Sequence, residues 1–79
     1  MAVDQAHPTI IDAGYTGGEP PVDTVLTGTI QGEFWAVKRM GEHASCWQWA
    51  GTSGPGNTWE GLLAIFRDVP FTVARWGAG

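Results

Sequence analysis

The chain has 79 residues, enough for one small domain that buries about 60–65% of the surface its unfolded form exposes. Charged residues make up only 15% of the chain, and the formal net charge is −4. This balance argues against nucleic-acid binding, because neutralising phosphates requires clustered cations. Five Trp and three Phe argue against wholesale disorder, since disordered chains are poor in aromatic residues.

The single cysteine, Cys46, excludes an internal disulfide and a zinc site built on several cysteines. The chain lacks the cationic start and apolar stretch of a secretory signal. It also lacks the run of about 20 apolar residues that spans a bilayer. We therefore expect a protein of the cytoplasm or of a virion, not secreted through a signal peptide and without membrane contact.

Residues 1–23 are predicted to form an extended acidic arm that is an interaction element and not part of the fold. Glycines and prolines interrupt any periodicity, and Pro20-Pro21 favours an extended path. Within the arm, Pro8–Asp12 is compatible with a short edge strand. Residues 1–33 carry five acidic and no basic residues. The arm is therefore either solvated or laid on a basic surface, its own or a neighbour's.

Residues 24–79 are predicted to form a compact, Trp-rich β body. Thr24–Ile30 is rich in β-branched residues and predicts a strand. Glu33–Arg39 predicts a second strand, and Gln31-Gly32 between them is a plausible two-residue hairpin turn. Alternation along the second strand places Glu33, Trp35, Val37 and Arg39 on one face and Phe34, Ala36 and Lys38 on the other.

A third strand is predicted over Ala44–Ala50, with Trp47 and Trp49 on the same face. Small residues then form a loop over 51–56, and the final strand is predicted over Phe71–Trp76.

A helix is favoured over about 58–67, between that loop and the last strand. Apolar residues there follow a helical stripe, and Asn57 is a candidate N-cap with Glu60 three residues later. The apolar run Leu62–Phe66 also fits a buried strand. The sequence as a whole predicts a mainly β (α+β) fold: a small antiparallel sheet or barrel with one short helix and an extended N-terminal arm.

No constellation in the chain completes a catalytic or metal site. His43 and Cys46 have the spacing of half a metal site or of a nucleophile pair, but further Cys ligands are lacking and the only other His is His7, in the arm. We interpret Cys46 as a buried apolar residue without chemistry. The Gly-rich loop before the helix lacks the lysine of a phosphate-binding loop. We therefore expect no enzyme activity, no cofactor and no metal.

The tryptophans are the strongest functional signal. They can serve as core or as a contact surface, and we expect some to do each, because aromatic rings bury a large area and interface hot spots are enriched in Trp, Tyr and Arg. We favour Trp49 as a contact residue because it borders the loop that starts at Gly51. The candidate partner-binding residues are Trp47, Trp49, Trp35, Ile10, Ile11, Tyr15 and Arg39.

The expected function is that of a non-enzymatic assembly protein, one copy among many in a homo-oligomer or larger complex of protein chains. An arm before a Gly- and Trp-rich β body resembles the layout of small virion decoration, or cement, proteins, an analogy of layout only. Two alternatives remain open. One is a small inhibitor or regulator that docks on a single partner protein, and the other is a carbohydrate-binding module with a Trp platform.

Overall fold

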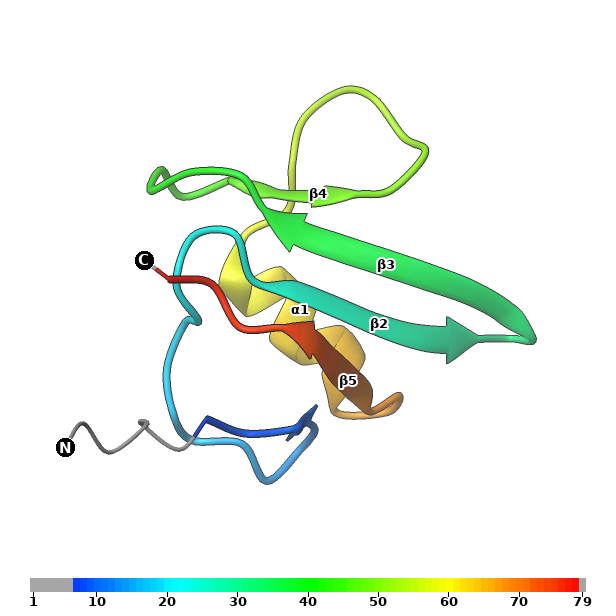
Figure 1. The fold of residues 1–79 in the computed structure, drawn as a ribbon. Helices are drawn as coiled ribbons and strands as arrows, with labels where there is room; N and C mark the ends of the chain where they lie inside the picture. Colours follow the sequence, from blue (N-terminus) through cyan, green and yellow to red (C-terminus); the bar gives the residue numbers. More distant parts are fainter. Residues whose placement is uncertain (1–6, 79) are drawn as a thin grey trace, which may run out of the picture.

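The computed structural model describes residues 7–78. The part of the predicted arm before His7, and Gly79, lie outside the described residues. Within the described range, one antiparallel sheet has the strand order β1-β5-β2-β3-β4, and α1 lies across one of its faces (Figure 1). The elements are β1 (Ile10–Ile11), β2 (Val25–Ile30), β3 (Glu33–Arg39), β4 (Trp47–Trp49), α1 (Trp59–Phe66) and β5 (Phe71–Arg75). The predicted mainly β fold with one short helix is confirmed, and the sheet is open, not closed into a barrel.

The β2–β3 hairpin forms as predicted, with six residue pairs from Val25↔Lys38 to Ile30↔Glu33. Its turn residues Gln31 and Gly32 have φ angles of 51° and 83°. Positive φ at both central residues gives the turn a twist that matches the twist of the two strands.

The core lies between α1 and the sheet. Leu26, Val37 and Phe71 point into it from the strands, and Leu62 and Phe66 meet them from the helix. The Phe71 ring fills the space above Gly28, because a Cβ atom added there would lie 2.5 Å from Phe71 Cδ1. Glycine in this strand therefore makes room for an aromatic ring from the neighbouring strand.

Helix α1 begins one residue later than the sequence suggested. Thr58, not Asn57, is the N-cap, and its Oγ1 accepts a hydrogen bond from the Gly61 N–H at 3.1 Å. Asn57 is engaged elsewhere, since its backbone pairs with Trp47 and its side chain accepts from the Trp49 indole at 3.1 Å. The predicted apolar stripe does face the sheet.

The described part of the N-terminal segment is packed into the body, which differs from the expected division at residue 23. Strand β1 pairs with β5, and Ile11 is fully buried in the core. Glu19 and Asp23 form ion pairs with Arg39 (3.5 Å) and Lys38 (3.8 Å). The acidic segment thus lies on cationic residues of its own body. The sequence did not predict this packing, because an extended, glycine-rich segment has no apolar periodicity that would mark a buried side.

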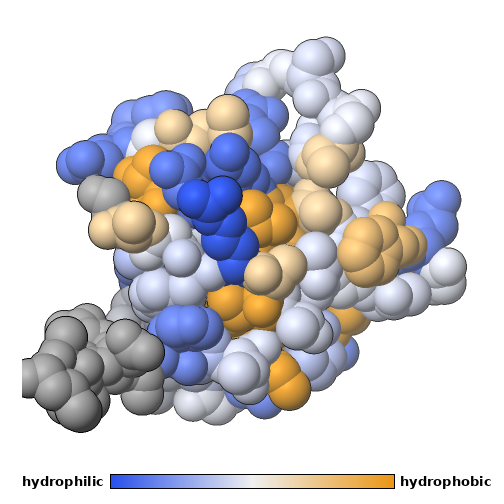
Figure 2. Space-filling model, viewed as in Figure 1, coloured by the Kyte–Doolittle hydropathy of each residue, from blue (hydrophilic) through white to orange (hydrophobic). Residues whose placement is uncertain are grey.

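Helix α1 is too short to cover the whole sheet. Its eight residues span about 12 Å, whereas the seven residues of β3 span about 23 Å. The turn end of the β2–β3 hairpin therefore projects beyond the other strands (Figure 1). In the same orientation, Figure 2 shows apolar surface over the projecting part of this hairpin.

Candidate binding site

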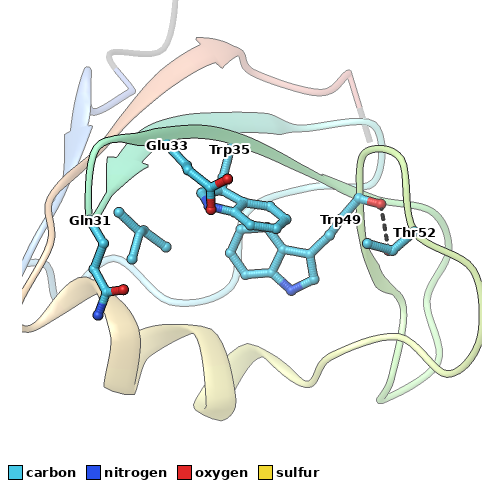
Figure 3. Close-up of a pocket in the computed structure, with 6 residues that line it drawn as sticks. Gln31, Glu33, Trp35, Trp49 and Thr52 are labelled. Carbon is cyan, nitrogen blue, oxygen red and sulfur yellow. Dashed lines mark hydrogen bonds between the residues drawn. The ribbon is translucent and has the colours of Figure 1, made fainter.

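A pocket of about 380 Å³ lies beside the projecting end of the hairpin. Trp35 of β3 and Trp49 of β4 form two of its walls, with their ring centroids 5.7 Å apart and their planes at 82°. Figure 3 shows both indoles, together with Glu33, on the side of the sheet that faces α1. The residues that line the pocket are Ile30, Gln31, Glu33, Trp35, Trp49 and Thr52.

The walls of the pocket are anchored to the core through a series of aromatic contacts. Trp49 packs edge-on against Phe71 at 6.0 Å, and Phe71 packs on Phe66 at 4.8 Å. The Trp49 indole N–H donates to Asn57 Oδ1 at 3.1 Å. Trp35 is half-buried, and its indole packs against that of Trp49. The pocket is therefore preformed, because its aromatic walls are fixed by packing and by a hydrogen bond.

The outer edge of β3 is open next to this pocket. Strand β4 pairs with residues 37–39 of β3, and the Ala50 N–H donates to the Ala36 carbonyl at 2.8 Å. Among the described residues, no strand pairs with β3 on this side before Ala36. Backbone groups of alternate residues point to the same side of a strand. Phe34 therefore directs its N–H and C=O to the same side as Ala36, outward from the sheet.

Two exposed side chains lie at this edge, the apolar Phe34 and the acidic Glu33. The Phe34 side chain is 73% exposed and lies on the face opposite to Trp35. Glu33 is exposed at the rim of the pocket. Two ion pairs form within residues 7–78, Lys38–Asp23 and Arg39–Glu19, and Glu33 belongs to neither.

The structure brings two of the candidate partner-binding residues together, Trp35 and Trp49. It places Trp47 and Ile11 in the core, fully buried, where neither presents surface to a partner. A sequence does not reveal how far other elements cover one face of a sheet, so it does not distinguish these buried side chains from contact residues.

The remaining candidates lie apart from the pocket. Arg39 is occupied inside the molecule, where it donates to the carbonyls of Pro20 (2.6 Å) and Gly41 (3.0 Å). Tyr15 is half-buried, donates to the Gly18 carbonyl at 2.6 Å and packs edge-on against Trp59. Ile10 is 50% exposed on the edge strand β1.

Cys46 is buried, as expected, and its sulfur lies 3.4 Å from Arg39 Nε. His43 is exposed. Between His7 and Ala78, no group of three or more His, Cys, Asp or Glu side chains is arranged to hold a metal ion. Nor does the described part of the chain contain a helix of the length and apolarity needed to cross a bilayer.

Sequence reasoning missed Phe34 and Glu33 as site residues. The alternation along β3 carried a signal for both, since it placed Glu33 beside Trp35 and left the large apolar Phe34 on the opposite face. It could not show that β4 stops short of these residues, because that depends on where the chain leaves the sheet after Ala50.

No protein-family model, no curated protein and no solved structure matches this chain. Its function is therefore inferred from its own geometry.

Proposed function

We propose that this protein is a non-enzymatic docking and assembly module that binds another polypeptide chain along β3. The observation that carries the proposal is the juxtaposition of a preformed tryptophan pocket with an unpaired strand edge. A strand edge supplies backbone hydrogen bonds to an extended partner, and a neighbouring pocket supplies selectivity for its side chains. Buried Trp residues in such pockets are typical centres of binding energy.

In this proposal the docked segment extends the sheet beside Phe34. Its side chains alternate between the two faces of the sheet, so one set meets the Trp35 pocket and the other meets the exposed Phe34 ring. Such docking suits a protein that joins many copies into an assembly, of which a virion decoration protein is one example. It also suits an inhibitor or regulator that docks on a single partner.

The arrangement of the indoles favours a polypeptide over a sugar as the ligand. Trp35 and Trp49 meet at 82°, so they form a corner. A platform on which a sugar ring stacks against two indoles needs coplanar rings.

The proposal is tested by site-specific photo-cross-linking in cells of the native host. A photoreactive phenylalanine analogue replaces Phe34 in the full chain, and in a matched control it replaces Ala64, which is exposed on the outer side of α1. We expect protein cross-links, to another copy or to another protein, from position 34 and not from position 64. Equal or absent protein cross-linking at the two positions would contradict docking at this edge.

A further inference from the structure

We propose that the Trp35–Trp49 pocket receives the cationic side chain of a Lys or Arg carried by the docked strand. This inference rests on the proposed docking function and adds the chemistry of the partner. It follows from three features of the pocket, namely its aromatic corner, its single charged group and its position relative to the strand edge.

The aromatic corner is suited to an organic cation. The electron-rich faces of indoles attract ammonium and guanidinium groups within about 6 Å of the ring centroid. Since the centroids of Trp35 and Trp49 are 5.7 Å apart, a cation in the corner can reach this range for both rings. Ile30 adds an aliphatic surface to the lining, against which the methylene stem of a Lys or Arg can pack.

The charge of the pocket complements a cation. Glu33 is the only charged residue in the lining, and it takes part in neither of the ion pairs of residues 7–78. Figure 3 shows its carboxylate on the same side of β3 as the Trp35 indole. A cation between the indoles would therefore gain an opposite charge at the rim, and the net charge of −4 favours its approach.

Pairing along the strand edge would position such a side chain at the pocket. A segment that hydrogen-bonds to the Phe34 N–H and C=O lies directly beside β3. Alternate side chains of that segment point to the face on which Trp35 and Glu33 lie. One residue of the docked strand therefore projects its side chain toward the corner, while its neighbours meet Phe34 on the other face.

The test uses the full chain labelled with ¹⁵N and a short capped peptide in which Thr and Val alternate around one central Lys. A second peptide replaces Lys with norleucine, which keeps the aliphatic stem and removes the charge. A third keeps Lys but carries N-methyl groups on the amides that would pair with β3. Titrations follow the Phe34 amide signal and the indole N–H signals of Trp35 and Trp49, and they are repeated with Glu33→Gln and with the control Glu42→Gln, an exposed acid in the loop after β3.

We expect the Lys peptide to shift all three signals and to bind at least about fivefold more tightly than the norleucine peptide, since a cation held by aromatic faces is worth about 1 kcal/mol or more. Glu33→Gln should weaken the Lys peptide several-fold and leave the norleucine peptide unchanged, whereas Glu42→Gln should change neither. The N-methylated peptide should lose most of its binding.

Equal binding of the Lys and norleucine peptides would overturn the cationic assignment and leave the docking function standing. Failure of all three peptides to shift these signals would overturn the inference, while the cross-linking experiment judges docking on its own. Shifts of the indole signals with oligosaccharides, and not with peptides, would overturn both.

Discussion

Glu19 ties the N-terminal segment to the sheet. Its Oε2 accepts a hydrogen bond from Trp47 Nε1 at 2.8 Å and lies 3.5 Å from Arg39 Nε. Because Trp47 is fully buried, its indole N–H depends on this carboxylate. A buried donor that loses its acceptor costs about 1–3 kcal/mol.

We therefore predict that Glu19→Ala lowers the free energy of unfolding by about 1–3 kcal/mol. Glu19→Gln should cost less, because the amide oxygen can still accept the hydrogen bond from Trp47. The remaining loss of stability comes from removing the charge opposite Arg39. The matched control is Glu42→Ala, at an exposed loop position, which should stay within about 0.5 kcal/mol of the parent. Urea denaturation measures all three, and equal effects of Glu19→Ala and Glu42→Ala would contradict the role of Glu19.

Tyr15 makes the stability of the fold depend on pH in the alkaline range. Burial raises the pKa of its phenol above the ordinary value of 10.0, and the neutral hydroxyl donates to Gly18. The folded state thus holds this proton more tightly than the unfolded state does. The stabilisation is complete below about pH 10 and is lost as the pH rises through the folded pKa. We expect the unfolding free energy to fall more steeply above pH 10 for the parent than for Tyr15→Phe, and parallel pH profiles would contradict this.

Individual elements differ in how far local sequence determines them. The β2–β3 hairpin was predictable because its strand pattern and turn are local, and Glu33–Arg39 has the predicted bounds. Strand β1 has only two residues, and it is set by pairing with β5, sixty residues further along the chain. The N-cap was misassigned at Asn57, because that residue is recruited by Trp47 and Trp49 in β4.

Gly28 shows how one element constrains the next. Alanine normally suits a strand better than glycine, but a Cβ atom at this position would lie 2.5 Å from the Phe71 ring. We predict that overpacking prevails and that Gly28→Ala costs about 1–3 kcal/mol of stability. Thr29→Ala, at the exposed neighbouring position, is the control and should cost less than about 1 kcal/mol. Thermal unfolding of both variants measures the difference, and a stabilising Gly28→Ala would refute the contact.

At the scale of the whole molecule, the chain from His7 to Ala78 behaves as one body, since its N-terminal segment contributes to the core. The neighbouring residues Ile10 and Ile11 test this with the same side chain in two environments, one 50% exposed and one fully buried. Ile11→Ala should destabilise the protein by about 2–5 kcal/mol, whereas Ile10→Ala should cost under about 1 kcal/mol. Chemical denaturation compares them, and similar small losses would show that the segment is separable from the fold.

The candidate site was only partly predictable for a related reason. The sequence indicated that tryptophans would form a contact surface and named Trp35 and Trp49 among the candidates. It also named Trp47, because strand alternation puts that residue on the same face as Trp49. What separates them is Trp59 of α1, whose ring centroid lies 5.4 Å from that of Trp47, so that Trp47 is fully buried whereas Trp49 is half-buried. Burial of a strand residue by an element that is distant in the sequence depends on the tertiary fold, so no pattern of neighbouring residues predicts it.

Docking beside the tryptophan pocket requires that the outer edge of β3 be open in the monomer, and amide hydrogen exchange of the monomeric full chain tests that edge at residue resolution. Phe34 and Trp35 are neighbours in β3, but the Phe34 N–H points outward, whereas the Trp35 N–H points toward β2, where Trp35 pairs with Gly28. We predict fast exchange at Phe34 and exchange at least about tenfold slower at Trp35, because the latter requires the hairpin to open. Equally slow exchange of the two amides in the monomer would show that the edge is already covered and would contradict its use for docking.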